Sequence, residues 1–266
     1  MHIVACQFDI AWKDRQENFA RVRSLLSQRP TPPGSLIVLP EMFASGFTMN
    51  VGVALDAAGD TIVFLGELAR SYQSTVVAGI VDKHADGRGL NQAVVIGPDG
   101  KEITRYTKMH PFTPAGESEH YAPGDTVVIF NHESFIVAPL ICYDLRFPER
   151  FREAVRLGAD VMIVIASWPA ARAAHWTALL TARAIENQAY VVGVNRIGRD
   201  PAHTYPGLSS VIGPKGDVLV LADDKPTALH ADLDREELRL TAGRCRSCKI
   251  QTEPLSPGAG STPGDN

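Results

Sequence analysis

Short runs of apolar residues alternate along this chain with longer segments in which apolar residues recur every three or four positions. Short apolar runs bounded by turn residues are typical of buried strands, and the periodic segments are typical of helices that cover a sheet. The pattern predicts strands at 2–8, 35–41, 74–81, 90–96, 101–108, 126–130, 135–142, 160–167 and 191–197. It predicts helices at 15–28, 59–73, 148–159 and 171–190. Such alternation favours a layered α/β fold around one core.

Two further features concern turns and the end of the chain. The sequences GPDG (97–100) and GPKG (213–216) each join two apolar runs, and their Gly and Pro residues predict hairpin turns. The similar turns suggest two related halves, but four matched residues are too few to establish a repeat. We expect one domain over 1–242 and a disordered tail over 243–266, because the tail is rich in Gly, Pro and Ser with few apolar residues.

Composition and charge narrow the class of protein. The 266 residues are 45% hydrophobic and 21% charged, which suits a globular protein with a sizeable core. The net charge is −4 and basic residues are scattered, so we expect no nucleic-acid partner. No apolar run approaches the roughly 20 residues of a membrane span, and the N-terminus lacks the features of a signal peptide. The irregular spacing of Cys6, Cys142, Cys245 and Cys248 favours a reduced, cytoplasmic protein.

Three reactive side chains stand at the ends of predicted strands: Glu41, Lys108 and Cys142. Functional groups of α/β proteins gather at the carboxyl ends of strands, so the pattern indicates one site with a base, a cation and a thiol. The thiolate would attack, the carboxylate would move protons, and the ammonium would stabilise a negative oxygen and favour the thiolate. The backbone N–H of Tyr143 is a candidate second oxyanion donor. Taken singly, Cys142 is equally interpretable as a core residue, and the two charged residues as surface groups.

Other kinds of site find less support in the sequence. A cysteine–histidine hydrolase would need an imidazole, and nothing in the pattern singles out His110, His120, His175 or His203. The CRSC segment at 245–248 is a single CxxC with no second pair, which argues against a structural zinc site. The chain has no GxGxxG segment and no His-rich cluster. We therefore expect no organic cofactor and no metal.

Three segments together carry a family resemblance. LPEMFASGF (39–47), YTKMHPF (106–112) and CYDLRFPE (142–149) resemble, in order and separation, the signature segments of the nitrilase, or carbon–nitrogen hydrolase, superfamily. The resemblance runs from residue 2 to about residue 242. It implies a four-layer α/β/β/α sandwich with two mixed sheets. It also implies that Glu41 is the general base, Lys108 the oxyanion stabiliser and Cys142 the nucleophile.

The family has a second glutamate after the lysine, for which this chain offers Glu117 and Glu119. We favour Glu117, because its separation from the turn at 123–125 matches the family's pattern. The resemblance then implies that Glu117 holds Lys108 and assists proton transfer. Glu119 is interpreted as a hydrated loop residue.

The residues after Cys142 discriminate between branches of the superfamily. True nitrilases carry Cys-Trp-Glu, whereas this chain has Cys-Tyr-Asp-Leu-Arg at 142–146, which is similar to the amidases. The segments 42–50 and 166–198 resemble the bacterial omega-amidases, which act on linear amides such as 2-oxoglutaramate and 2-oxosuccinamate. The resemblance therefore implies a small-molecule amide substrate and a cysteine thioester intermediate. The alternatives are an amidase for deaminated glutathione or N-carbamoyl compounds, and an inactive binding protein of the same fold.

The omega-amidase resemblance suggests four substrate-binding residues: Phe43, Phe47, Trp168 and Arg172. The aromatic residues are equally interpretable as core packing. Arg172 is the candidate partner for a carboxylate at the far end of the substrate. For Arg146, which also follows a strand of the active edge, we expect instead a salt bridge with Asp144 or Glu149.

The helix predicted at 171–190 bears on assembly. Its apolar side chains fall on more than one face: Trp176, Leu179, Leu180, Ala184 and Ile185. A helix of this kind is typical of one buried between subunits, so we expect a homodimer. The C-terminal segment departs from the aromatic-containing ending of the family, which leaves the details of assembly open.

Overall fold

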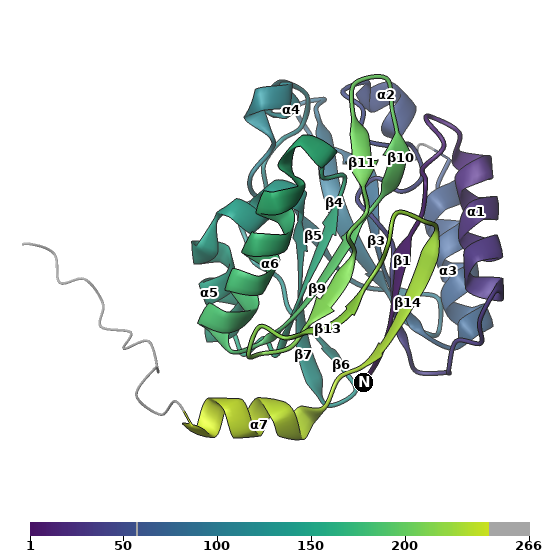
Figure 1. Cartoon of the computed structure of the whole chain (residues 1–266). Coiled ribbons are helices and arrows are strands. Elements are labelled where there is room, and N and C mark those ends of the chain that lie inside the picture. Colours follow the sequence, from purple (N-terminus) through teal and green to yellow (C-terminus); the bar gives the residue numbers. More distant parts are fainter. Residues whose placement is uncertain (57, 245–266) are drawn as a thin grey trace, which may run out of the picture.

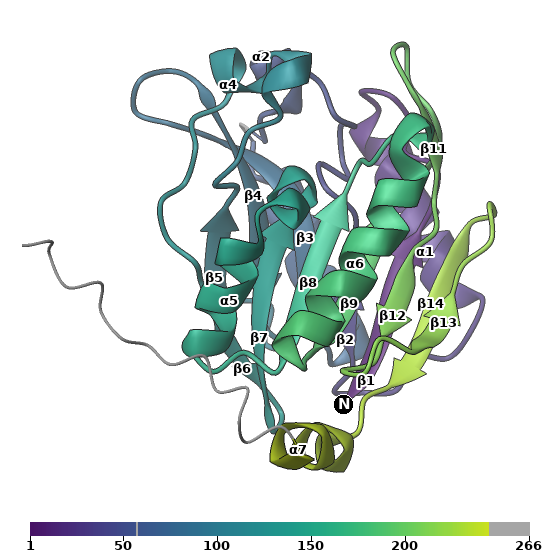
Figure 2. The same cartoon turned by 60° about the vertical axis from the view of Figure 1, so that its left-hand side comes forward.

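The computed structural model describes residues 1–56 and 58–244, which form four layers. Two six-stranded sheets pack face to face in the middle. Helices α1 (Arg15–Ser27) and α3 (Asp60–Tyr72) cover the outer face of the first sheet (Figure 1). Helices α5 (Pro148–Arg156) and α6 (Ala173–Asn187) lie across the outer face of the second sheet (Figure 2). The predicted α/β/β/α sandwich is confirmed.

The first sheet has the strand order β14-β1-β2-β3-β4-β5. It is mixed, because β1, β2 and β3 are parallel while β14, β4 and β5 each run antiparallel to their neighbours. Its strands are β1 (His2–Gln7), β2 (Leu36–Val38), β3 (Thr75–Lys83), β4 (Gly89–Ile96), β5 (Glu102–Thr107) and β14 (Thr227–Asp232).

The second sheet has the order β13-β12-β9-β8-β7-β6, with β7, β8 and β9 parallel and the outer strands antiparallel. Its strands are β6 (Phe130–His132), β7 (Phe135–Ile141), β8 (Val161–Ala166), β9 (Tyr190–Asn195), β12 (Ser210–Ile212) and β13 (Val218–Leu221). A separate hairpin of β10 (Ile197–Arg199) and β11 (Thr204–Pro206) lies at the same end of the molecule as α2 (Val51–Ala54) and α4 (Glu117–His120) (Figure 1).

The period-two alternation of strand side chains lets each sheet serve two interfaces. In β1, Ile3 and Ala5 belong to the core that includes the second sheet, whereas Val4 and Cys6 belong to the cluster beneath α1 and α3. Every one of these positions is apolar and fully buried. A strand buried on both faces therefore appears in the sequence as a continuous apolar run.

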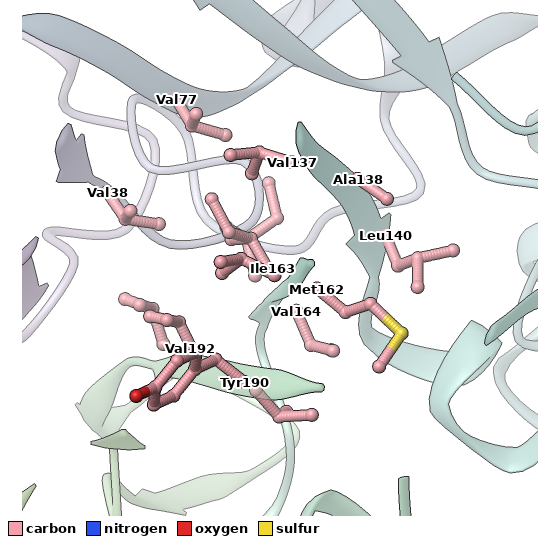
Figure 3. Close-up of a cluster of buried hydrophobic side chains, with 14 of the residues drawn as sticks. Val38, Val77, Val137, Ala138, Leu140, Met162, Ile163, Val164, Tyr190 and Val192 are labelled. Carbon is pink, nitrogen blue, oxygen red and sulfur yellow. The ribbon is translucent and has the colours of Figure 1, made fainter. Parts of the chain in front are cut away.

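The second sheet shows the same division. Val137 and Ile163 lie toward Val38 and Val77 of the first sheet (Figure 3). The residues next to them in sequence, such as Met162, face the other side, toward α5 and α6, because neighbours in a strand alternate. The second sheet is thus also covered on both faces, which leaves its polar groups to gather at the strand ends.

Most of the predicted strands and helices are present, and both GPxG segments form the predicted hairpin turns. They connect β4 to β5 and β12 to β13, and each hairpin includes an edge strand of its sheet. Gly100 and Gly216 have φ values of 79° and 89°. Glycine adopts this left-handed conformation at low cost, which explains its place at the end of each turn.

The strand predicted at 126–130 is wrong over most of its length. Residues 122–129 have no regular structure, and β6 begins only at Phe130. Val127 is buried in the core, so its apolar character reflects side-chain packing rather than strand pairing. The sequence pattern also misses β14, which pairs with β1 over six residues at the edge of the first sheet. Strand β14 depends on its pairing with β1, which lies more than two hundred positions away in the chain.

Helix α7 (Arg235–Arg244) extends two residues into the segment predicted as a tail. The rest of that segment, including Cys245 and Cys248, lies outside the described residues, so the predicted disorder and the CxxC interpretation stay predictions. None of the helices in the described ranges combines the length and apolar character needed to cross a membrane.

One close approach in the first sheet is open to a stability test. A Cβ added at Gly79 of β3 would lie 2.5 Å from Glu41 Cα and 2.6 Å from Pro40 O. Because both contacts are with backbone, we expect Gly79→Ala to lower the free energy of unfolding by about 1–3 kcal/mol. Urea titration measures this, with Gly52→Ala as the control, since a Cβ there meets nothing closer than 3.5 Å. Equal stability of the two variants would contradict the packing argument.

Candidate active site

The predicted base and cation meet at one end of the first sheet. Strands β2 and β5 run in the same direction, so Glu41, just beyond β2, and Lys108, directly after β5, reach the same edge. Lys108 Nζ donates a hydrogen bond to Glu41 Oε1 at 2.9 Å. The Glu41 side chain is 0% exposed and that of Lys108 1%, so this ion pair lies in a nearly dry interior.

The second glutamate of the cluster is Glu117, the first residue of α4. Its Oε2 accepts hydrogen bonds from Lys108 Nζ at 2.8 Å and from the backbone N–H of Phe112 at 2.5 Å. Glu119, the alternative candidate, is exposed on the same helix. The cluster therefore holds two carboxylates and one ammonium, and Glu117 is the second carboxylate that anchors Lys108.

Sequence reasoning misses Asn91, which joins the two carboxylates. Its Nδ2 donates to Glu41 Oε1 at 2.7 Å and to Glu117 Oε1 at 2.8 Å. A signal for it exists, because in β4 it falls on the same face as Ala93 and Val95, which belong to the core between the sheets. A polar side chain in that row is buried and needs polar partners.

Glu41 also connects the two sheets. Its Oε2 accepts a hydrogen bond at 2.8 Å from the backbone N–H of Ser167, the residue that follows β8 of the second sheet. Oε1 already accepts from Lys108 and Asn91, so the remaining lone pair of the carboxylate is on Oε2. The same Ser167 N–H lies against the Cys142 thiol. Oε2 is therefore the oxygen suited to take the proton of the thiol.

Cys142 stands on a sharp turn. It directly follows β7 and begins the 3₁₀ helix η2 (Cys142–Arg146), with a φ of 45°. Non-glycine residues rarely adopt this left-handed conformation, and where they do the surrounding structure must enforce it. The backbone N–H of Tyr143 lies in the first turn of η2, where N–H groups have no partner within the helix. It is thus available to a substrate oxygen beside the thiol.

A buried carboxylate holds the turn in place. Asp144 Oδ2 accepts hydrogen bonds from the Ile141 backbone N–H at 3.1 Å and from the Tyr106 hydroxyl at 2.8 Å. Its Oδ1 accepts from the His110 backbone N–H at 3.0 Å and lies 2.9 Å from His110 Nδ1. His110 is therefore a partner of Asp144, which gives no support to a Cys142–His110 dyad.

The charges of the cluster determine the resting state of the thiol. Burial and the Glu41 carboxylate raise the pKa of the Cys142 thiol well above its ordinary value, although Lys108 opposes them. Burial by itself would lower the pKa of the Lys108 ammonium, but Glu117 and Glu41 raise it well above its ordinary value. Lys108 does favour the thiolate, as expected, but burial and the two carboxylates outweigh it, so the pKa of the thiol is raised overall. The raised pKa favours the thiol form of Cys142 at neutral pH.

A pocket of about 360 Å³ opens beside Cys142. Three of the predicted substrate-binding residues line it, namely Phe47, Trp168 and Arg172. The complete lining is Phe47, Phe112, Cys142, Tyr143, Arg146, Ser167, Trp168, Pro169, Arg172 and His203. Nothing in the sequence pattern pointed to His203, which the β10–β11 hairpin carries to the pocket. Among the described residues, no three His, Cys, Asp or Glu side chains gather in positions that would hold a metal ion.

Phe43 does not reach the pocket, so its expected role in substrate binding is wrong. Its side chain is 0% exposed in the cluster beneath α1 and α3, and its ring centroid lies 6.1 Å from those of Phe19 and Phe64. The residue between it and the base, Met42, has a φ of 46°. This tight turn sends Glu41 toward the second sheet and Phe43 toward the helices.

Arg146 does reach the pocket, and the salt bridge expected with Asp144 or Glu149 is absent from the described residues. The oxygens of Asp144 are occupied by the groups that hold the turn. The guanidinium lies 5.0 Å from the centre of the Trp168 ring, and its Nη2 lies 3.0 Å from His175 Nδ1. Arg146 is thus a second basic group at the pocket.

Arg172 has similar surroundings. Its guanidinium lies 4.9 Å from the centre of the Phe112 ring. Within residues 1–56 and 58–244, neither Arg172 nor Arg146 has a carboxylate within salt-bridge distance. Stacking on an aromatic ring orients a guanidinium and leaves its N–H groups available in the ring plane. The pocket therefore offers two cationic groups to a ligand.

The charge of Glu41 is open to a direct test. After burial, this carboxylate contributes most to the raised pKa of the Cys142 thiol. We expect the thiol of Glu41→Gln to ionise at a lower pH than in the wild type, because the cation of Lys108 remains while one carboxylate is lost. The ultraviolet absorbance of the thiolate, followed against pH and corrected with Cys142→Ala, measures the shift. Glu119→Gln is the control and should show none; an unchanged midpoint in Glu41→Gln would contradict the assignment.

Comparisons with known proteins identify relatives of the chain. Residues 3–242 match the carbon-nitrogen hydrolase family. The chain is similar to omega-amidase YafV of Escherichia coli strain K12, at 37% identity over 245 residues, which cover 90% of this chain and 92% of the relative. It is also similar to a 2-oxoglutaramate amidase of Bacillus subtilis strain 168, at 31% identity over 237 residues. These residues cover 88% of this chain and 91% of the relative.

The fold is also found in a solved structure. A CN-hydrolase superfamily protein from Xanthomonas campestris, described with an arsenic adduct in its active site, matches with a TM-score of 0.87 and 28% identity. The match covers 97% of this chain and 99% of that protein. Taken with the family match over nearly all of the described residues, it shows that the chain belongs to the carbon–nitrogen hydrolase family.

Proposed function

We propose that the protein is an omega-amidase. It hydrolyses the terminal carboxamide of a short dicarboxylate monoamide, such as 2-oxoglutaramate or 2-oxosuccinamate, to the acid and ammonia. The observation that carries the proposal is a pocket beside Cys142 in which Arg146 and Arg172 have no carboxylate partner among the described residues. An anionic end group on the substrate supplies that partner. The similarity to an omega-amidase and a 2-oxoglutaramate amidase supports the same substrate class.

In the first half of the reaction, Cys142 Sγ attacks the amide carbon while its proton passes to Glu41 Oε2. The carbonyl oxygen becomes negative, and the Lys108 ammonium and the Tyr143 N–H stabilise it. Glu41 then gives the proton to the amide nitrogen. The C–N bond breaks, ammonia leaves, and the acyl group stays on Sγ as a thioester.

In the second half, Glu41 takes a proton from a water molecule whose oxygen attacks the thioester carbon. The C–S bond breaks, the carboxylic acid leaves, and the proton returns from Glu41 to the sulfur. Glu117 keeps Lys108 oriented throughout, since it accepts from Nζ with both oxygens, at 3.1 and 2.8 Å. The raised pKa of the thiol fits this scheme, because proton transfer and attack occur together.

This scheme needs no cofactor, because the chain itself supplies nucleophile, base and cation. We expect the enzyme to act in the cytoplasm. Cys6 and Cys142 are both unpaired thiols, which suits a reducing compartment.

A panel of small amides, assayed for ammonia release, tests the proposal. We expect dicarboxylate monoamides to react faster than simple aliphatic amides, deaminated glutathione, N-carbamoyl compounds and nitriles. Cys142→Ala should abolish turnover in a protein that still folds. A preference for deaminated glutathione or an N-carbamoyl compound would move the protein to another amidase group, and a Cys142→Ala protein with near wild-type rates would disprove the mechanism.

The basic groups of the pocket give a sharper test. We expect Arg172→Met to raise the KM for 2-oxoglutaramate by about ten- to a hundredfold, the worth of a hydrogen bond between charged groups. The KM for a neutral amide of equal length should change much less. The control is Arg152→Met on the outer face of α5, where Arg152 pairs with Glu186. Equal changes in KM for the charged and neutral amides would show that Arg172 does not bind the substrate carboxylate.

We also propose that two copies of the chain pair through the outer face of α6. Trp176 and Leu180, part of the apolar set that motivated the expectation, pack inside their own protomer and lend it no support. The exposed residues of α6 do support the expectation, because many of them are small or apolar: Ala174, Thr177, Ala178, Ala182 and Ile185. A face with few charges suits the core of an interface between subunits.

A charge placed on that face tests the pairing. We expect the wild type to be a dimer by light scattering at micromolar concentration, and Ala178→Glu to be a folded monomer, because a buried unpaired carboxylate opposes association. Val63→Glu is the control, since Val63 is 59% exposed on α3, in the opposite outer layer. A monomeric wild type, or a dimeric Ala178→Glu, would count against this interface.

A further inference from the structure

Asn91 is, like Lys108, a buried side chain that donates to both carboxylates of the site, but it carries no charge. It lies in β4 and is 1% exposed. A single atom, Nδ2, donates to Glu41 Oε1 and to Glu117 Oε1. We propose that Asn91 is a positioning residue, whose amide holds the two carboxylates side by side in their ionised forms. This inference rests on the roles proposed for Glu41 and Glu117.

The charges explain why a neutral double donor is needed at this place. Two carboxylates and one ammonium leave the cluster with one excess negative charge in a nearly dry interior. Carboxylates that share such a site tend to share a proton as well, which would remove the base. The Asn91 amide brings two N–H groups without a charge. It therefore favours two ionised carboxylates, whereas a second lysine would compete with Lys108 for them.

The geometry gives the amide a second effect. Lys108 Nζ and Asn91 Nδ2 both bond to Oε1 of Glu41, at 2.9 and 2.7 Å. With this oxygen held twice, and Oε2 held once by the Ser167 N–H at 2.8 Å, the carboxylate cannot rotate without breaking a hydrogen bond. The free lone pair of Oε2 thus keeps a fixed direction.

The partners of the amide separate this role from simple packing. Asn91 Oδ1 is buried and has no hydrogen-bond partner among the described residues, which is unfavourable for a polar atom. Asn18 provides the contrast. It is 0% exposed and uses both ends, since Oδ1 accepts from the Ala11 N–H at 2.7 Å and Nδ2 donates to Ala44 O at 2.9 Å. Asn187 of α6 also has a buried Oδ1 without a partner among the described residues, so what distinguishes Asn91 is that it donates to both carboxylates of the site.

Asn91→Leu tests the proposal, because leucine has a similar shape and no donors. We expect kcat to fall by about ten- to a hundredfold, the worth of one lost hydrogen bond to a charged group, with KM changed much less. We also expect the acidic limb of the pH–rate profile to move to higher pH, because the unassisted carboxylates take up a proton more readily. The titratable side chains around the amide are Glu41, Glu117, Lys108, Cys142 and Tyr121.

Asn18→Leu is the matched control. It removes a buried asparagine of equal size outside the site, so it should lower the melting temperature and leave the acidic limb in place. Wild-type kcat and an unmoved limb in Asn91→Leu would overturn the proposal, as would a fall in melting temperature alone. If Asn91→Leu does not fold, Asn91→Ser is measured in the same way, with the same two outcomes.

A readout without substrate separates this inference from the proposed function. Iodoacetamide alkylates Cys142 whichever amide the enzyme prefers, and its rate against pH reports the same base. We expect Asn91→Leu to move the acidic limb of alkylation to higher pH and Asn18→Leu to leave it unchanged. A shifted limb without turnover of any dicarboxylate monoamide would leave Asn91 in its role and reject the substrate class. Turnover of a dicarboxylate monoamide with an unshifted limb would support the substrate class and reject the role of Asn91.

Discussion

The buried ammonium of Lys108 is the constraint on which the rest of the site depends. A charge in a dry interior costs several kcal/mol unless it is paired and hydrogen-bonded. Here it is paired with Glu41 and Glu117, so the cluster carries one negative charge in excess. Burial and that excess together raise the pKa of the neighbouring thiol, so the proposed attack by Cys142 requires a base. The position of each group therefore depends on the charges and hydrogen bonds of the others.

The two sheets of the sandwich make this arrangement possible. Glu41 and Lys108 follow strands of the first sheet, while Cys142 and Ser167 follow strands of the second. The hydrogen bond from the Ser167 N–H to Glu41 closes the gap between them at 2.8 Å. Because both sheets are buried on both faces, their strand ends are rigid supports. The close contact of Gly79 with the backbone near Glu41 adds to that rigidity.

Chemistry and selectivity lie on different parts of the chain. The charged groups of the cluster lie near strand ends or, for Glu117, at the start of α4, and Asn91 lies within a strand. Much of the pocket wall comes instead from connections between elements, including Phe112, Trp168 and His203. Connections vary more easily than the strands they join. This division explains how a family keeps one reaction while its members differ in substrate.

The sequence by itself determined much of the secondary structure and the main residues of the candidate site. Apolar runs located most of the strands, and three signature segments identified Glu41, Lys108 and Cys142. These features are local, since strand burial and strand ends can be recognised within ten residues or so. Asn91 was also within reach, because it shares a face of β4 with two core residues. The similar hairpin turns were recognised for the same reason, from the conformational freedom of glycine.

The tertiary structure decided what depends on distant neighbours. Phe43 and Phe47 have the same side chain four residues apart, yet one lies in the core and the other in the pocket, because the backbone turns at Met42. Arg146 lacks its expected carboxylate partner because Asp144 is occupied by the turn it supports. The protonation state of Cys142 is the clearest case. A pKa depends on burial and on the charges nearby, and neither can be counted until the chain has brought Glu41, Lys108 and Glu117 to the same place.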